Sequence, residues 1–194
     1  GHLRPFAAEL QTMMRPPGVR RLDQLAGQLL MVGFDGLSAP PSLVERIRAS
    51  EVGGVILFSR NIQDPVQVAT LVDHLRAAAP ADAPLLIGVD QEGGRVQRLR
   101  APLVAWPPMR DVAACGDVAL TERVGRAIAE DLAWLGFNLD FAPVLDVVCS
   151  DENTVIGDRS FGCTAEEVCA QGLAMMRGLR DGGVLPCGKH FPGH

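Results

Sequence analysis

The sequence predicts an α/β protein that supplies about the first five β/α units of an eight-stranded (β/α)8 barrel of the TIM type. Five apolar runs of strand length alternate with four helical patterns, which predicts a parallel sheet with right-handed crossovers. Polar residues follow the second, third, fourth and fifth runs alike, as expected where every strand end faces one central site. The alternative, a doubly wound sheet, uses chiefly one switch point, and no G-x-G-x-x-G or phosphate-loop motif follows the first strand. The pattern therefore favours the barrel.

The length of the chain bears on its domain organisation, and its net charge bears on the classes of partner it could bind. A full barrel takes about 250 residues, so we expect residues 1–194 to be the N-terminal part of a single domain, with residues 1–20 as a leading segment. The net charge of −5 argues against nucleic acid, which requires a basic face. No apolar run approaches the ~20 residues of a membrane span. We therefore expect neither nucleic acid nor a membrane as a partner.

Cysteine usage and the first residues bear on the compartment. The five cysteines are odd in number and include no CxxC pair, which favours reduced thiols over a disulfide framework. The N-terminal residues lack the long apolar stretch of a signal peptide. Both features favour a cytoplasmic location.

The first half of the chain yields three strands. Residues 1–20 are interpreted as a short helix and a turn, and residues 29–34 as the first strand. Ser42 and Glu45 match a capping box that would open a helix. The second strand is 54–58, followed by a helix that Asp64 caps, with its apolar side formed by Val68, Leu71, Val72 and Leu75. The third strand, 85–89, ends in Asp90.

The second half adds two strands and a long connection. Residues 99–118, rich in proline and glycine, predict an irregular segment, and a helix from about Leu120 stops at Gly136. The fourth strand is 139–147. Thr164 and Glu167 form a capping box for a helix to about Arg180, and the fifth strand is 184–189.

Several strand ends carry side chains that could bind a ligand. Asp90 is interpreted either as an acceptor for hydroxyl groups or a general base, or as a cap on the following turn. Arg95 and Arg98 would share one side if residues 94–98 were helical, and the planar fork of arginine suits oxygen-rich ligands. Arg159 stands beside Asp158, a common arrangement for a solvated ion pair. Lys189 and His190, at the end of the fifth strand, are predicted to donate hydrogen bonds to a ligand.

Two further groups of residues could form a catalytic site or a metal site. Asp140 and Asp146 would point to the same side of one strand. Retaining glycosidases place their two catalytic carboxylates ~5 Å apart, whereas six strand residues span roughly 20 Å. Asp140 and Asp146 therefore cannot form such a pair. Cys187, His190 and His194 have C-x2-H-x3-H spacing, so zinc was considered. Because Pro192-Gly193 predicts a turn and a further ligand at suitable spacing is missing, we expect no metal at these residues.

Four motifs together resemble one known family. The segments GVDQEGGRVQRL, LDFAPVLDV, IGDRSFG and GKHFPGH, in this order, are similar to glycoside hydrolase family 3, and within it to bacterial β-N-acetylglucosaminidases of cell-wall recycling. The resemblance runs from about Leu22 to His194. It implies a (β/α)8 barrel and a retaining exo-β-glycosidase that removes terminal non-reducing β-linked N-acetylglucosamine from peptidoglycan fragments. The resemblance also implies that the enzyme needs no cofactor and that its partner is a small-molecule carbohydrate.

The resemblance also implies roles for particular residues. Asp90 corresponds to the aspartate that holds sugar hydroxyls, and the remaining substrate-binding positions correspond to Arg98, Arg159, Lys189 and His190. Glu92 is interpreted as a support for its loop. The family's acid/base histidine, in an Asp-x-His motif just after GKHFPGHG, and its aspartate nucleophile have no counterpart here. We expect both after His194, and we expect residues 1–194 alone to be inactive.

Two alternatives stay open at this point. One is a β-glucosidase or another exo-β-glycosidase of the same family, since GKHFPGH is shared more widely within it. The other, of a different class, is a non-catalytic sugar-binding module.

Overall fold

The structure, a computed structural model, describes residues 22–149 and 153–194, and the predicted leading segment lies outside them. Its first elements are α2 (Leu22–Gly27), β1 (Met31–Val32), α3 (Pro41–Arg48), β2 (Gly54–Leu57), the 3-10 helix η1 (Ser59–Asn61), α4 (Pro65–Ala78) and β3 (Leu86–Val89). There follow β4 (Gln91–Gly93), β5 (Val96–Gln97), α5 (Met109–Ala114), α6 (Val118–Trp134), β6 (Leu139–Asp140), the 3-10 helix η2 (Gly157–Arg159), α7 (Ala165–Asp181) and β7 (Leu185–Pro186).

Five parallel strands form the sheet, in the order β1-β2-β3-β6-β7. Each strand lies beside the one that precedes it in the chain, apart from the separate β4–β5 hairpin. A doubly wound sheet reverses its strand order at a switch point, and this sheet does not. The predicted α/β class with a parallel sheet is confirmed, and the doubly wound alternative is wrong.

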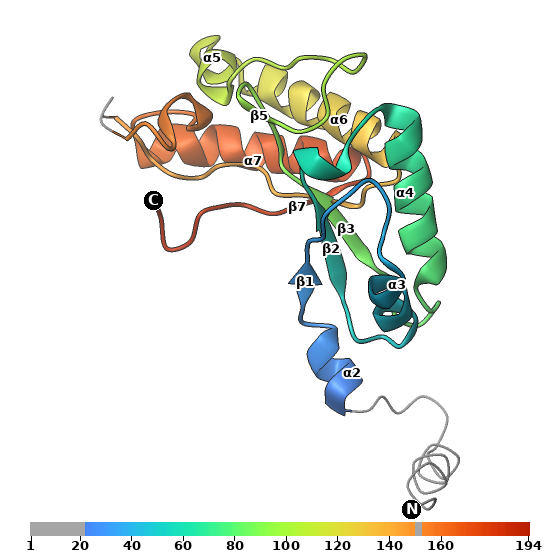
Figure 1. The fold of residues 1–194 in the computed structure, drawn as a ribbon. Helices are drawn as coiled ribbons and strands as arrows, with labels where there is room; N and C mark the ends of the chain where they lie inside the picture. The colour runs from blue at the N-terminus through green and yellow to red at the C-terminus, as the bar shows by residue number, and fades with distance from the viewer. Residues whose placement is uncertain (1–21, 150–152) are drawn as a thin grey trace, which may run out of the picture.

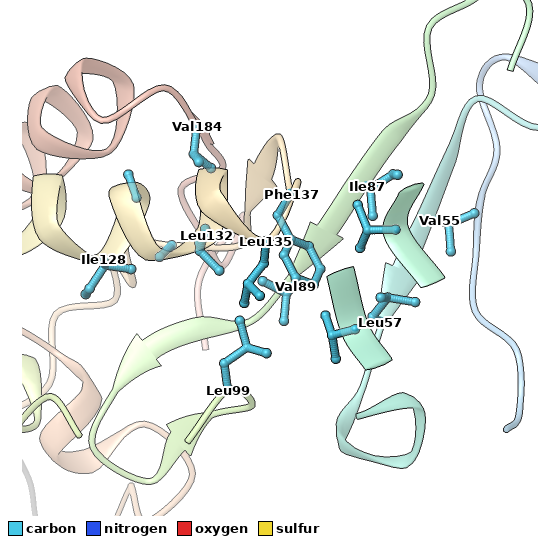
Figure 2. Packing of buried hydrophobic residues seen from close by; sticks show 14 of the residues in the cluster. Val55, Leu57, Ile87, Val89, Leu99, Ile128, Leu132, Leu135, Phe137 and Val184 are labelled. Atoms are coloured by element: carbon cyan, nitrogen blue, oxygen red, sulfur yellow. The ribbon is translucent and has the colours of Figure 1, made fainter. Parts of the chain in front are cut away.

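Helices and strands bury a main apolar core, and a small second cluster consists of Val144, Val148 and Ile156. In Figure 1, α3 and α4 lie beside β1 to β3, and α6 and α7 run next to each other. Figure 2 shows Val89 of β3 facing Leu132, Leu135 and Phe137 from the end of α6, all of them buried. The apolar side predicted for α4 is buried as expected.

Among the described residues, no helix combines the length and apolar character needed to span a bilayer.

Helix starts were predicted well where a side chain caps them. Asp64 accepts a hydrogen bond from the backbone N–H of Gln67 at 2.8 Å. Thr164 and Glu167 form the predicted capping box of α7. The box predicted at Ser42 is wrong, because the N-cap of α3 is Pro40, two residues earlier, and no side chain caps the helix. A proline at the first position already supplies the helical φ there.

The fourth and fifth strands are shorter than predicted. β6 ends at Asp140 and β7 at Pro186, and beyond them Val144 and Lys189 form only an isolated bridge. Beyond the strands the two segments keep only scattered backbone hydrogen bonds, such as those that the Cys187 and Lys189 N–H groups donate to the carbonyls of Ala142 and Pro143. The prediction that 139–147 is one continuous strand is therefore wrong.

The segment after β3 is an antiparallel hairpin, not a helix. β4 and β5 pair across a turn in which Gly93 and Gly94 have φ of +97° and +57°. The turn lies against the predicted irregular connection: Gly94 donates its N–H to the Trp106 carbonyl at 2.8 Å. A Cβ on Gly93 would stand 2.6 Å from the Pro107 carbonyl oxygen. This connection also contains the short helix α5, which the sequence did not predict.

We expect Gly93→Ala to lower the free energy of unfolding by about 3 kcal/mol, through backbone strain and overlap with Pro107. Gly116→Ala is the matched control, because Gly116 also has a positive φ (+69°) but no atom within 4 Å of the added Cβ. Strain alone should cost it about 1 kcal/mol. Urea unfolding of both variants measures the difference, and equal losses would show that the contact with Pro107 does not matter.

Candidate functional site

The carboxyl ends of three neighbouring strands bring the predicted polar residues together. Asp90 directly follows β3, Asp140 ends β6, and Lys189 follows β7. Because these strands are parallel neighbours, the residues after them converge at one edge of the sheet. The backbone bridge between Val144 and Lys189 extends this edge beyond the strands themselves.

Asp90 is held by two cations. Its Oδ1 accepts from Lys189 Nζ at 2.8 Å, and its Oδ2 accepts from Arg98 NH2 at 3.3 Å. The Asp90 carboxylate is mostly but not fully buried, so part of it stays accessible. The two ion pairs fix its orientation without using all of its acceptor capacity.

Glu92 is the most buried member of this network, with 3% of its side chain exposed. Arg159 donates to both of its oxygens at 2.8 Å, in the bidentate geometry of a guanidinium on a carboxylate. Lys189 Nζ lies 2.5 Å from the same carboxylate. The hydrogen bonds that Arg159 donates to Glu92 raise the pKa of Arg159. One carboxylate therefore joins the hairpin, the η2 loop and the segment after β7.

The hairpin separates the two arginines that a helix would have placed side by side. Arg98 pairs with Asp90, and its Nε is buried without a hydrogen-bond partner. Arg95 instead pairs with Asp158 at 3.2 Å. The shared side predicted for Arg95 and Arg98 is therefore wrong, and so is the predicted pairing of Asp158 with Arg159.

Two arginines hold the loop that carries Arg159. Arg95 NH2 donates to the carbonyls of Thr154, Val155 and Ile156. Arg110, on α5, donates to the carbonyls of Val148, Gly157 and Ser160. The irregular loop thus has its carbonyls satisfied by side chains, which fixes the direction from which Arg159 reaches Glu92.

Asp140 lies beneath the network and is fully buried. Its Oδ1 accepts from the Gln91 N–H at 3.0 Å, and its Oδ2 has no partner. Burial raises the pKa of Asp140 well above its usual range, against the opposing effects of Gln91 and Lys189. Its hydrogen bond from the Gln91 backbone ties β6 to the hairpin, which is a structural role.

Asp146 is the other strand aspartate, and it contacts His190. His190 Nδ1 lies 2.5 Å from Asp146 Oδ2, and the His194 N–H donates to Asp146 Oδ1 at 2.8 Å. The expectation that Asp140 and Asp146 share one strand face is wrong, because the strand ends between them.

The structure thus gathers four predicted residues, Asp90, Arg98, Arg159 and Lys189, into one network, with His190 beside it. Sequence reasoning underestimated Glu92, although alternation along an extended chain would place it on the same side as Asp90. It also missed Arg110, for which no local signal exists.

Within residues 22–149 and 153–194, no group of three or more His, Cys, Asp or Glu side chains is arranged to hold a metal ion. Cys187, His190 and His194, which have zinc-like spacing in the sequence, therefore form no such group.

Comparison with known proteins identifies relatives along nearly the whole chain. The family model described as the N-terminal domain of glycosyl hydrolase family 3 matches residues 21–194. A β-hexosaminidase of Thiobacillus denitrificans is 46% identical over 158 residues, which cover 77% of this chain and 43% of that protein. The chain spans about half the length of the curated relatives it matches.

Solved structures agree in fold. A family 3 β-N-acetylglucosaminidase of Paenibacillus sp. FPU-7 is 43% identical, with a TM-score of 0.84 over 91% of this chain and 34% of that one. NagZ of Neisseria gonorrhoeae, in complex with N-trifluoroacetyl-D-glucosamine, is 37% identical, with a TM-score of 0.77 over 85% of this chain and 50% of that one.

We expect Glu92→Gln to lower the free energy of unfolding by about 3 kcal/mol, because it leaves the largely buried Arg159 without its carboxylate and removes one of the two carboxylates that Lys189 contacts. Glu122→Gln is the control: it removes one carboxylate from a more exposed pair with Arg177 and should cost less than about 1 kcal/mol. Chemical denaturation at pH 7 measures both. Similar losses would show that burial does not set the strength of the Glu92 contacts.

Asp140 predicts a pH dependence of stability. Because its pKa is raised in the folded chain, the unfolded chain loses this proton first as the pH rises above about 4. The free energy of unfolding contributed by Asp140 is therefore complete at lower pH and is lost as the pH rises toward the folded pKa. Asp140→Asn should lose less stability than the unmodified chain between pH 4.5 and 7.5. Parallel denaturation curves for the two proteins would contradict the assignment.

Proposed function

The chain belongs to glycosyl hydrolase family 3, and from this membership we propose that it forms the sugar-binding part of a retaining exo-β-N-acetylhexosaminidase. The proposed substrate is a peptidoglycan fragment that ends in non-reducing β-linked N-acetylglucosamine. The observation that carries the proposal is the ion-pair network of Asp90, Glu92, Arg98, Arg159 and Lys189 at one edge of the sheet.

Hydrogen-bond capacity supports a hydroxyl-rich ligand. An ammonium group has three donors, and Lys189 uses two of them on Asp90 and Glu92, so one remains for a ligand. Each Asp90 oxygen accepts one bond from the protein and has a further lone pair. A sugar hydroxyl both donates and accepts, so it can bind between Lys189 and Asp90.

Charge balance supports an uncharged ligand. The site combines three cationic side chains, Arg98, Arg159 and Lys189, with the carboxylates of Asp90, Glu92 and Asp146. The cations are already neutralised within the protein, so a phosphate would find little unpaired positive charge. A neutral saccharide can use the fixed donors and acceptors without disturbing these ion pairs.

In the proposed reaction these residues position the sugar and do not cleave it. Fixed contacts to several hydroxyls hold the anomeric carbon in one place, which converts binding energy into alignment of the reacting bond. Cleavage by double displacement requires a carboxylate nucleophile and an acid/base group. The family resemblance assigns these roles to an aspartate and a histidine that have no counterpart among the 194 residues.

The proposal includes the barrel and the compartment. The chain-order sequence of strands and the crossovers in one direction support five units of a (β/α)8 barrel, whose remaining strands would pair with β1 and β7. The reduced cysteines are consistent with a cytoplasmic location.

We expect the 194-residue chain to bind N-trifluoroacetyl-D-glucosamine, with binding read from the fluorine NMR signal of the ligand. Asp90→Ala should weaken binding at least about tenfold, because it removes an acceptor and leaves Lys189 and Arg98 without their shared carboxylate. Asp73→Ala, which removes an exposed carboxylate on α4, is the matched control and should bind as the unmodified chain does.

Two further arms discriminate the alternatives. N-acetylglucosamine should displace the ligand and glucose should not; equal displacement would favour the β-glucosidase alternative. The same preparation should release no aglycone from an aryl β-N-acetylglucosaminide. Binding unaffected by Asp90→Ala would sink the proposed site, and turnover by the 194-residue chain would show that its cleaving residues lie within it.

A further inference from the structure

Asp146 has geometry that the proposed binding role does not explain. Its side chain is 1% exposed, and both of its oxygens are occupied by donors from the last segment of the chain: the His190 ring and the His194 N–H. Burial alone would raise the pKa of Asp146, but the hydrogen bonds from His190 and His194 outweigh it and lower the pKa. Asp146 is therefore an anion that can only accept hydrogen bonds.

This restricts the protonation of His190. Because an ionised carboxylate donates nothing, the hydrogen in the 2.5 Å contact belongs to His190 Nδ1. The other ring nitrogen, Nε2, then has a lone pair whenever the imidazole is neutral. The Nδ1–H tautomer is the reverse of the one that free histidine favours.

We propose that Asp146 is a positioning residue that holds His190 in the Nδ1–H tautomer, so that Nε2 accepts a hydrogen bond from a sugar hydroxyl. The ligand part of this assignment rests on the proposed function. It differs from the expectation that both Lys189 and His190 donate to the ligand, because Lys189 would donate and His190 would accept. A sugar hydroxyl next to Lys189 and His190 would then accept a hydrogen bond from Lys189 and donate one to His190 Nε2.

The surroundings of the pair support this assignment. His190 is 36% exposed on its side chain, so part of the ring is accessible to a ligand while the Asp146 carboxylate is buried. Ser160 Oγ donates to the Asp146 carbonyl at 2.6 Å, which ties Asp146 to the loop of Arg159. The charged and titratable groups around His190 are Asp146, Lys189, Arg159 and the His194 ring, whose centroid lies 6.2 Å from that of His190. The charge of Asp146 also raises the pKa of Arg159.

The tautomer can be read directly in the 194-residue chain. Histidine-selective ¹⁵N labelling gives four ring systems, and loss of one set of signals in His190→Gln assigns His190. At the high-pH plateau of a titration, long-range ¹H–¹⁵N spectra distinguish a protonated from an unprotonated ring nitrogen. We expect His190 to show a protonated Nδ1 and an unprotonated Nε2; the opposite pattern would overturn the proposal.

Asp146→Asn should reverse that pattern. The His194 N–H holds the asparagine carbonyl in the place of Oδ1, so the amide NH2 faces His190 Nδ1 and forces it to accept. An asparagine in place of a histidine-orienting aspartate selects the wrong tautomer. Asp158→Asn, which changes a carboxylate in the neighbouring loop that pairs with Arg95, is the control and should leave the tautomer unchanged.

Sugar binding provides the second readout. With an Nε2–H donor facing the hydroxyl, Asp146→Asn should weaken binding of N-trifluoroacetyl-D-glucosamine about tenfold, while Asp158→Asn should not. If Asp146→Asn fails to fold, the spectrum of the unmodified chain still decides the tautomer. An unchanged tautomer in folded Asp146→Asn overturns the assignment whatever the sugar does. A reversed tautomer in a chain that binds no sugar supports the positioning role and overturns the proposed function instead.

Discussion

The buried carboxylate of Glu92 is the contact on which the arrangement of the site depends. It binds Arg159 through two hydrogen bonds and also contacts Lys189, so three segments far apart in the chain meet at one side chain. A carboxylate this buried is costly unless cations surround it, and these cations in turn need it. The hairpin, the η2 loop and the segment after β7 are therefore mutually dependent, and none has its observed position without the other two.

That dependence explains why irregular backbone can form a defined site. The η2 loop has little regular structure, yet its carbonyls accept from Arg95 and Arg110 and its Ile156 is fully buried. The hairpin is equally constrained, since Gly93 and Gly94 allow the chain around Trp106 to approach closely. Side-chain donors satisfy polar backbone groups that a sheet or helix would otherwise satisfy. The result is a rigid first layer around Asp90, which preorganised binding requires.

Local signals predicted the parts of the fold that depend on neighbouring residues. The start of α4 at Asp64 and of α7 at Thr164 followed from a side chain bonding to a nearby N–H, and the apolar side of α4 followed from its periodicity. Strand lengths were overestimated at β6 and β7, where the extent of pairing depends on a neighbour that the sequence does not identify. The hairpin after β3 was missed, although the Gly93-Gly94 pair between its two short strands is a local turn signal.

The sequence by itself determined the α/β class with a parallel sheet, and its motifs singled out Asp90, Arg98, Arg159, Lys189 and His190 as candidate binding residues. These follow from residue type, periodicity and motif, all of which are local. Only the tertiary structure decided the partners: Arg159 with Glu92 and not Asp158, Arg98 with Asp90 and away from Arg95, and His190 with Asp146. The physical reason is that the energy of an ion pair depends on distance and burial. Both are set where strand ends and loops meet, and neither can be read from spacing along the chain.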